Sequence, residues 1–363
     1  MPLNRRELLQ QGTLLAMSSS LPLNDALAAD TKAATAPKVD PYRDAIFVDG
    51  PPPLPAKDSF TVVVLPDTQH YSEKFPDRFF AQTNWIAAQI ESRRIAAVLH
   101  LGDITNRNSA PEWEVAKGAL GKLDGRVPYF MTLGNHDYGD RGGCADRTTQ
   151  FNDFFPLEKY RAKPEFGGVY DREPERLENN YHLFSAGGRN FLVLSLEFGP
   201  RADVIRWANE VVAKHRDREA ILITHAYMYY DETRYDWKQR GKDQRWNPHS
   251  YKVAAATNDD VHDGEELWAQ LVSKHENFIC TFNGHVLDDG LGRLTTATPG
   301  GRNVHQLLVN FQMKPNGGDG WLRLLEFKAD RRTVVVRDYS PVLDRQNESP
   351  QNRFDLELAA VKT

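Results

Sequence analysis

Five short apolar segments of this chain each run into an Asp, an Asn or a His, and this arrangement restricts the fold more than any other feature. The segments are FTVVVLP, IAAVLHL, VPYFMTL, AILIT and NFICTFN. Runs of β-branched and aromatic residues that stop at a polar turn are typical of buried strands. Helical spacing separates the first three segments, over residues 77–92 and 111–123. Alternating strands and helices predict βαβ units and a sheet with both faces covered.

The second half of the chain is expected to hold more strands than helices. A hairpin is predicted around Gly187-Gly188, between YHLFSA and FLVLSLEF. The remaining segments with a regular pattern are helices at 201–215 and 262–275, and strands at 293–298, 303–311, 321–328 and 332–338. The interval 226–261 is irregular, and a loop of that length inside a compact domain is usually functional or disordered.

The residues that end the five strands are of the kinds that bind metal ions. Ligands bind at the carboxyl ends of strands in open α/β sheets, so we expect these side chains to share one edge. Any one of them is explained as a turn or a helix cap, but five in succession predict a site. Mixed oxygen and nitrogen donors suit Zn²⁺, Mn²⁺ or Fe rather than Ca²⁺. The candidate ligands are Asp67, Asp103, Asn135, His225 and His285.

Phosphoester hydrolysis is a reaction that such a donor set supports. A carboxylate can bridge two cations roughly 3.5–4 Å apart, which hold phosphoryl oxygens and turn bound water into hydroxide. The motifs that carry the candidates are G-D-x-x-N at 102–106, G-N-H-D at 134–137 and G-H at 284–285. With these motifs the chain resembles the calcineurin-like metallophosphoesterase superfamily over about residues 60–340. The resemblance implies an α/β fold, a four-layer α/β/β/α sandwich with mixed sheets.

The resemblance also implies a role for each motif residue. Asp103 would be the bridging carboxylate, and Asp67 would bind one of the metals. The ligands of the other metal would be Asn135, His225 and His285. His136 would protonate the leaving group, held by Asp137 or Asp103, so His136 and Asp137 are the catalytic candidates. One or two divalent ions (Mn, Zn or Fe) are expected per chain, with attack on phosphorus by a metal-bound hydroxide.

Two positions depart from the superfamily pattern, and both concern the metal that Asp67 would bind. The pattern has His where this chain has Gln69 and Leu287. A Gln carbonyl is a harder and weaker ligand than imidazole, and Leu offers no donor. We therefore expect Gln69 to contact metal in an oxygen-rich site that binds its ion weakly; the alternative is that Gln69 is a loop amide. Nearby polar residues that could refill the site are His70, Asp288 and Asp289.

The segment that follows His225 has the composition of a substrate-binding loop. It is rich in aromatic and basic residues, which can contact a ring-bearing or anionic substrate. The candidate substrate-binding residues are Tyr227, Arg234 and Arg245. A packed surface Ω-loop is the alternative.

The first residues have the order of an export signal. Arg5-Arg6 precede a mildly apolar stretch at 14–23, and small residues follow at 26–29. This order predicts a twin-arginine signal peptide and a periplasmic or secreted protein without a membrane anchor in its mature form. The expected organisation is a signal peptide at 1–29, a linker or extended arm at 30–58, a metallophosphoesterase domain at 59–340 and a C-terminal tail at 341–363.

The amino-acid composition excludes several other classes of protein and of site. With 45 Lys and Arg against 50 Asp and Glu, the net charge is −5, which excludes nucleic-acid binding driven by bulk charge. Two cysteines exclude a disulfide framework and a Cys-rich metal site. We expect an exported phosphoesterase that acts on a small phosphorylated substrate. The alternatives are a protein Ser/Thr phosphatase on the same scaffold, a metal-bound phosphate- or ligand-binding module with degraded catalysis, and a structural cell-envelope protein.

Overall fold

The computed structural model describes residues 40–359 of the 363-residue chain. The expected signal peptide at 1–29 lies outside the described residues. Within the described part, none of the helices is both long enough and apolar enough to span a membrane.

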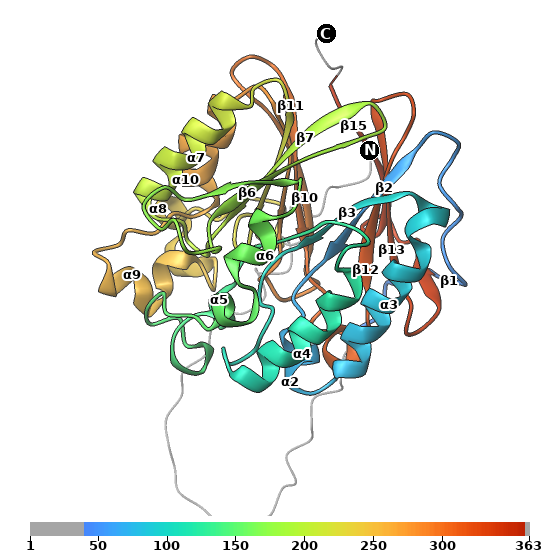
Figure 1. Cartoon of the computed structure of the whole chain (residues 1–363), viewed down its shortest axis with the longest axis horizontal. Coiled ribbons are helices and arrows are strands. Elements are labelled where there is room, and N and C mark those ends of the chain that lie inside the picture. Colours follow the sequence, from blue (N-terminus) through green and yellow to red (C-terminus); the bar gives the residue numbers. More distant parts are fainter. Residues whose placement is uncertain (1–39, 360–363) are drawn as a thin grey trace, which may run out of the picture.

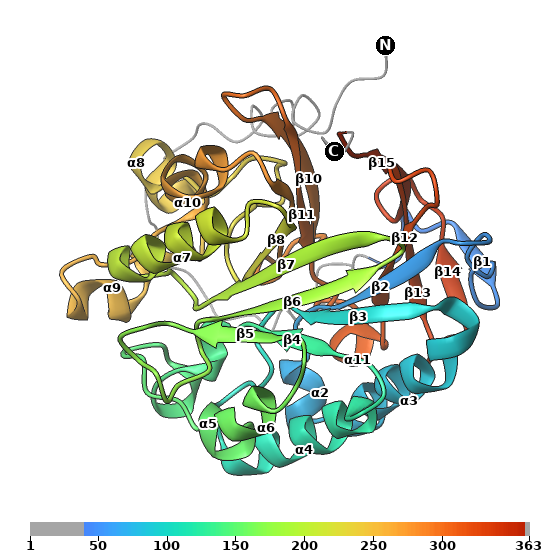
Figure 2. The ribbon, with the colours of Figure 1, turned by 45° about the horizontal axis from the view of Figure 1, so that its top comes forward.

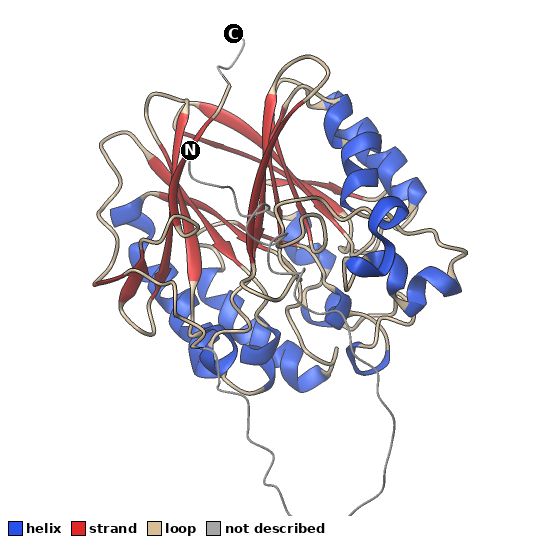
Figure 3. Cartoon of the chain, turned by 180° about the vertical axis from the view of Figure 1, so that it is seen from behind, coloured by secondary structure: helices blue, strands red, loops and turns tan. Residues whose placement is uncertain are grey.

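Two mixed β-sheets form the centre of the protein (Figures 1 and 3). The first sheet has the order β1-β14-β13-β12-β2-β3-β4, with β15 paired to β13. Its strands are β1 (Phe47–Asp49), β2 (Phe60–Leu65), β3 (Ile95–His100), β4 (Tyr129–Met131), β12 (Leu322–Phe327), β13 (Thr333–Ser340), β14 (Arg345–Asn347) and β15 (Arg353–Glu357). The second sheet has the order β10-β11-β9-β8-β7-β6-β5. Its strands are β5 (Phe166–Val169), β6 (Asn180–Ala186), β7 (Arg189–Leu196), β8 (Glu219–Thr224), β9 (Phe278–Asn283), β10 (Leu291–Ala297) and β11 (Asn303–Val309).

Helices cover the outer faces of the two sheets. Figure 2 shows α3 and α4 beside β3 and β4, and α7 and α10 on the side of β7 and β8. The helices are α2 (Gln69–Glu73), α3 (Pro76–Arg93), α4 (Ala110–Leu120), α5 (Phe151–Phe154), α6 (Leu157–Arg161), α7 (Ala202–Lys214), α8 (Trp237–Arg240), α9 (Lys252–Ala256), α10 (Gly264–Gln270) and α11 (Pro315–Gly318). This arrangement confirms the expected four-layer α/β/β/α sandwich.

Strand alternation distributes the apolar side chains of β2 between two clusters. Val62 and Val64 pack in a cluster shared with the second sheet. Val63 and Leu65 pack in a cluster shared with α3 and α4. All four side chains are fully buried. Because both faces of the strand are covered, its sequence is a continuous apolar run instead of an alternating one.

Parallel pairing explains why the polar strand ends meet. β2, β3 and β4 are parallel in the first sheet. β7, β8, β9 and β11 are parallel in the second sheet. All five segments that run into Asp, Asn or His belong to these parallel sets, namely β2, β3, β4, β8 and β9. Within each sheet, the residues that follow these strands therefore lie at one edge.

The structure differs from the expected organisation at both ends of the domain. β1 pairs with β14, and β15 pairs with β13, so these segments are parts of the first sheet and not a linker or a tail. The strands are short, and β15 has the largely polar sequence RFDLE. An edge strand with one partner and little burial carries no long apolar run, which is the signal that identified the central strands.

A buried ion pair joins β12 to β13 in the first sheet. The Arg323 guanidinium donates to both oxygens of Asp338, at 2.7 Å each, and both side chains are almost wholly buried. The Asn352 amide donates to the same carboxylate at 2.7 Å. Burial raises the pKa of Asp338, so its negative charge depends on these donors.

Replacing Arg323 by Met leaves the Asp338 carboxylate buried without its cation. We expect the free energy of unfolding to fall by about 3–5 kcal/mol, measured by urea unfolding. The double variant Arg323→Met/Asp338→Leu removes both charges and should recover most of that loss. A single variant as stable as the wild-type protein would contradict the structural role of the pair.

Candidate metal centre

The predicted ligands gather at one edge of the sandwich, although they are far apart in the chain. Asp67 and Asp103 follow β2 and β3 of the first sheet, and His285 follows β9 of the second. The backbone N–H of His285 donates to Asp67 Oδ1 at 2.9 Å, across a separation of 218 residues. The carboxyl ends of both sheets therefore meet at a single site.

Three of the candidates form a compact group of donor atoms. One donor atom from each of Asp103, His225 and His285 lies within 4.8 Å of the other two. His225 Nε2 is 3.2 Å from Asp103 Oδ1 and 3.8 Å from Asp67 Oδ1. Ligands that bind a cation at about 2.0–2.2 Å are themselves about 3–4 Å apart, so these separations suit a shared ion.

Several buried polar atoms at this edge have no hydrogen-bond partner among the described residues. They include Asn135 Oδ1, His225 Nε2 and Asp67 Oδ2. Leaving a buried polar atom unpaired costs about 1–3 kcal/mol, so nearly all such atoms in proteins are bonded. A divalent cation would satisfy Asn135 Oδ1 and His225 Nε2 together, and two imidazoles with carboxylate and amide oxygens fit Zn²⁺, Mn²⁺ or Fe.

The backbone is crowded where the motifs meet, and this explains their glycines. A Cβ on Gly134 would lie 2.1 Å from Asp103 Oδ1, and one on Gly284 would lie 2.0 Å from Asp67 Oδ2. The candidate ligands Asp103 and His285 adopt positive φ angles of 47° and 74°. Such conformations cost about 1–3 kcal/mol in residues other than Gly, and they persist where function needs a particular side-chain direction.

Main-chain carbonyls fix which nitrogen of each histidine faces the site. The Nδ1–H of His225 donates to the Leu101 carbonyl at 2.7 Å. The Nε2–H of His285 donates to the Trp246 carbonyl at 2.7 Å. His225 therefore offers Nε2 and His285 offers Nδ1. A second bond of this kind usually orients a metal-binding imidazole.

Opposite charges control protonation in the cluster. Burial alone would raise the pKa of Asp103, but His225 and His136 hold it well below its usual range. Burial disfavours a charged His225, but the Asp103 carboxylate outweighs it and raises the pKa of His225 to about 9. Burial lowers the pKa of His285 to about 3, so this imidazole is neutral, as a ligand must be. The centre thus stabilises positive charge beside Asp103.

The ring of His136 is held by a main-chain carbonyl, and its backbone is held by the Asp103 carboxylate. Its Nδ1–H donates to the Asn106 carbonyl at 2.9 Å, and its backbone N–H donates to Asp103 Oδ1 at 2.9 Å. Asp137 points away, into the loop after β3. Its two oxygens accept four hydrogen bonds, from the N–H groups of Ile104, Thr105 and Gly134 and from the Thr105 hydroxyl. Asp137 therefore joins two motif loops, and the expected contact between Asp137 and the His136 ring is absent from the described structure.

The family model for calcineurin-like phosphoesterases matches residues 60–352 of this chain. The chain belongs to the calcineurin-like phosphoesterase family. Members of this family use divalent metal ions, and the donor cluster described above is the candidate site for one.

Two kinds of relative accompany this match. The uncharacterized protein YvnB of Bacillus subtilis (strain 168) is 30% identical over 305 residues, which cover 81% of this chain and 21% of the relative. The chain thus spans about a fifth of that protein's length. Purple acid phosphatase PPD1 from yellow lupin (Lupinus luteus) seeds is 12% identical, with a TM-score of 0.49 over 84% of this chain and 55% of that one. A 5'-nucleotidase precursor from Thermus thermophilus is 13% identical, with a TM-score of 0.42 over 83% and 54%. Likeness at this distance does not extend to a shared substrate.

The part of the site that departs from the family pattern is arranged differently from the expectation. Gln69 Nε2 donates to Asp103 Oδ2 at 3.0 Å and also to Gln312 Oε1. Gln69 therefore turns its amide N–H to the carboxylate, and not its carbonyl oxygen. The polar neighbours expected to refill the site lie outside the clustered donor groups of the described residues; they are His70, Asp288 and Asp289.

The loop after β8 is packed, and its three substrate candidates have different surroundings. Tyr227 is fully buried. Arg234 donates to Glu265 Oε2 at 2.6 Å and lies over the Trp268 ring at 4.7 Å from its centroid. Arg245 is exposed. Of the three, only Arg245 is both exposed and free of an ion pair within the described residues.

Sequence reasoning missed three residues that contact or lie close to the centre. Trp246 supplies the carbonyl that orients His285. The Tyr251 ring lies 6.0 Å from the His285 ring, and Gln312 reaches Gln69. Gln312 follows β11, which is parallel to β9, so the rule of polar residues after parallel strands could have found it. Trp246 acts through its main chain, and no residue-type signal predicts that contact.

A second group of clustered donor atoms belongs to the loop and not to the centre. The group consists of His249, Asp263 and Glu266. His249 bonds Asp259 through Nδ1 at 2.7 Å and Glu266 through Nε2 at 2.9 Å. Asp263 caps α10 by accepting from the N–H groups of Glu265 and Glu266. These donors are already engaged, so the group fastens the loop to α10.

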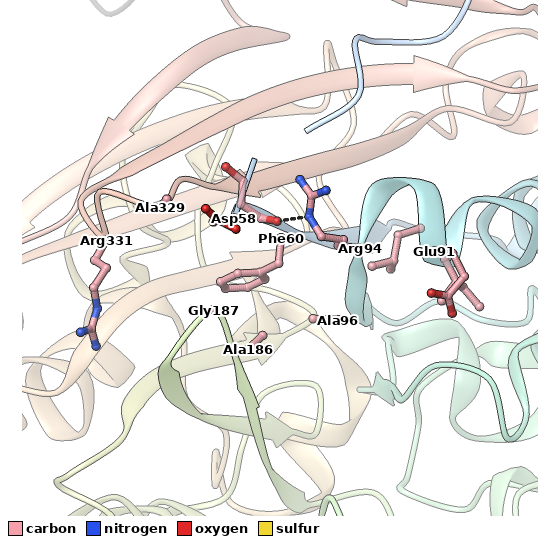
Figure 4. Close-up of a pocket in the computed structure, with 12 residues that line it drawn as sticks. Asp58, Phe60, Glu91, Arg94, Ala96, Ala186, Gly187, Ala329 and Arg331 are labelled. Carbon is pink, nitrogen blue, oxygen red and sulfur yellow. Dashed lines mark hydrogen bonds between the residues drawn. The ribbon is translucent and has the colours of Figure 1, made fainter. Parts of the chain in front are cut away.

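A cleft of about 630 Å³ lies at the opposite end of β2 and β3 (Figure 4). It is lined by Phe60 and Ile95, the first residues of these strands, and by Arg94 and Arg331. The dashed line in Figure 4 marks the bond from the Arg94 guanidinium to the Ser59 carbonyl. No residue of the metal centre lines this cleft.

Asp137→Asn replaces one acceptor oxygen with an NH₂ group that faces N–H donors. We expect a loss of about 2–4 kcal/mol in the free energy of unfolding, and weaker metal retention because the loops of Asp103 and Asn135 loosen. The shape of the pH–rate profile should be unchanged, since Asp137 does not touch the His136 ring. Asp140→Asn, at an exposed carboxylate, is the matched control. If only the Asp137 variant lost one limb of the pH–rate profile, Asp137 would have the catalytic role that the sequence predicted.

Proposed function

We propose that this protein is a phosphoesterase that hydrolyses small phosphorylated molecules with a divalent cation and with His136 as the general acid. Membership of the calcineurin-like phosphoesterase family supports metal-dependent phosphoester hydrolysis in general. The observation that carries the finer proposal is the fixed ring of His136, beside candidate ligand atoms that have no hydrogen-bond partner within residues 40–359.

Four side chains would hold the cation. They are Asp103, Asn135, His225 and His285. When bound there, a divalent cation lowers the pKa of a water and offsets the negative charge of a phosphoryl group. The protein contributes the orientation of each ligand, because main-chain bonds fix both imidazoles before any ion arrives.

His136 is placed to move a proton at Nε2. Its Nδ1–H is committed to the Asn106 carbonyl, which leaves Nε2 as the ring atom that can carry and donate a proton. The Asp103 carboxylate, which accepts the backbone N–H of His136, adds negative charge nearby. Protonation of the departing oxygen by Nε2–H matters most when the alcohol is a poor leaving group.

The exposed guanidinium of Arg245 is the best candidate for contacting an anionic substrate. It lies over the Trp246 ring at 4.6 Å from the centroid, and Trp246 in turn accepts a hydrogen bond from His285. Arg234 is neutralised by Glu265, and Tyr227 is buried, so both act in holding the loop. A substrate bound beside Arg245 would therefore be close to a metal ligand.

His136→Ala removes the proposed acid and leaves the ligands in place. We expect kcat for an alkyl phosphate to fall by about 10²–10⁴-fold. The fall should be much smaller for p-nitrophenyl phosphate, whose leaving group needs no proton. Metal content should be unchanged. His275→Gln, at a histidine bonded to Asn209, is the control and should keep full activity. The wild-type protein is also assayed on a panel of phosphate esters with Mn²⁺, Zn²⁺, Fe²⁺ and Mg²⁺. If it retains metal but hydrolyses none of them, the protein is a metal-bound binding module and the proposed enzymatic function is wrong.

We also propose that the protein is exported through the twin-arginine route to the periplasm or the medium. The support is the order of Arg5-Arg6, the apolar stretch at 14–23 and the small residues at 26–29. Twin-arginine export carries folded cargo, which suits an enzyme whose metal is bound before translocation.

Arg5→Lys/Arg6→Lys should block this export. We expect the uncleaved precursor to accumulate inside the cell, because the paired arginines are the feature that distinguishes this signal. Cell fractionation with immunoblotting measures the distribution, and Arg43→Lys, an exposed arginine outside the signal, serves as the control. Equal export of the double variant and the wild-type protein would refute the route.

A further inference from the structure

Asp103 is the side chain on which a second cation would depend. A carboxylate that bridges two ions gives one oxygen to each. Asp103 Oδ1 faces His225 Nε2 at 3.2 Å and accepts the backbone N–H of His136. Asp103 Oδ2 accepts a hydrogen bond from Gln69 Nε2 at 3.0 Å. The oxygen that would face a second ion is therefore occupied by an amide donor.

Gln69 is held in this orientation by a residue from the other sheet. Its Nε2 also donates to the side-chain carbonyl of Gln312. Gln312 follows β11, and its backbone N–H donates to Asn310 Oδ1 at 2.9 Å, which fixes the start of the turn. Gln69 itself is 1% exposed and has little freedom to rotate. The two amides form a pair that spans the two sheets.

The donors that remain at this second position do not suit a tightly held Zn²⁺, Mn²⁺ or Fe ion. Asp67 Oδ2 and Gln69 Oε1 are buried and have no hydrogen-bond partner within the described residues. They amount to one carboxylate oxygen and one amide oxygen, with no imidazole, because Leu287 stands at the other family position. The first position has four ligands, two of them imidazoles. Affinity for these metals rises with nitrogen donors, so the two positions differ greatly.

We propose that this protein holds a single tightly bound divalent cation, and that the Gln69–Gln312 amide pair takes the place of a second one. The N–H group of Gln69 presents partial positive charge to Asp103 Oδ2, where a metal would present a full one. The Gln312 amide nitrogen has no hydrogen-bond partner within the described residues and remains a donor for a phosphoryl oxygen. Only this last role, the binding of a phosphoryl oxygen by Gln312, rests on the proposed function.

Metal content tests the proposal directly. The full chain is loaded with excess Mn²⁺ or Zn²⁺, dialysed against metal-free buffer, and analysed by mass spectrometry of the metal. We expect about one ion per chain. The Mn²⁺-loaded protein should give the electron paramagnetic resonance spectrum of an isolated ion. Retention of two ions, or the spectrum of an exchange-coupled pair, would overturn the proposal.

Variants test whether the residues at positions 69 and 287 limit the protein to one tightly bound ion. The double variant Gln69→His/Leu287→His supplies the two imidazoles of the family pattern. It should raise the metal content about twofold, to about two ions per chain. Gln69→Leu/Leu287→Met changes the same positions without adding an imidazole and should stay at one ion. A folded His variant that still holds one ion would overturn the assignment of Gln69, with folding checked by circular dichroism.

The outcome is separable from the proposed function. A wild-type protein with one ion and no turnover of any ester supports the single-ion centre and rejects the phosphoesterase. A protein with two ions and turnover rejects the single-ion centre and supports the phosphoesterase.

Discussion

The candidate metal centre depends on one constraint, the parallel pairing that brings strand ends from two sheets to the same edge. Neither sheet carries all of the candidate ligands. The first contributes Asp103 and Asn135, and the second contributes His225 and His285. The hydrogen bond from the His285 backbone N–H to the Asp67 carboxylate joins the two halves. The fold itself, and not any short stretch of sequence, therefore determines the distances between ligands.

Asp103 is the electrostatic centre of this arrangement. Its carboxylate faces an imidazole, accepts a main-chain N–H group and accepts an amide N–H group. Each of these donors presents positive charge or partial positive charge, and together they offset the cost of burying a carboxylate. A buried anion surrounded in this way is a strong attractor for a cation on its remaining open side. The Gln69 amide occupies the Oδ2 side of Asp103, and the two candidate metal positions therefore differ.

Most of the fold and much of the centre follow from the sequence, because apolar runs and the polar residues after them are local signals. The central strands and the large helices were predicted from such runs, as FTVVVLP shows for β2. The edge strand β15 was not, since its polar sequence lacks that signal. At the site, residue types indicated a ligand set, but they could not show that Asp137 bonds the loop backbone and not the His136 ring. That distinction depends on side-chain direction, which spacing does not encode. The contact between Trp246 and His285 could not be predicted for a related reason, because the main-chain carbonyl of Trp246 makes it.

The hydrogen bond between His285 Nε2 and the Trp246 carbonyl links the path of the long loop after β8 to the orientation of a candidate metal ligand. Any residue at position 246 has that carbonyl, so the contact is indifferent to side-chain identity and sensitive to the path of the chain. An insertion or deletion between 226 and 261 would shift the carbonyl and tilt the imidazole while every ligand stayed in place. Proteins with identical ligand sets can in this way diverge in how long they retain their ion, through changes in loop length alone.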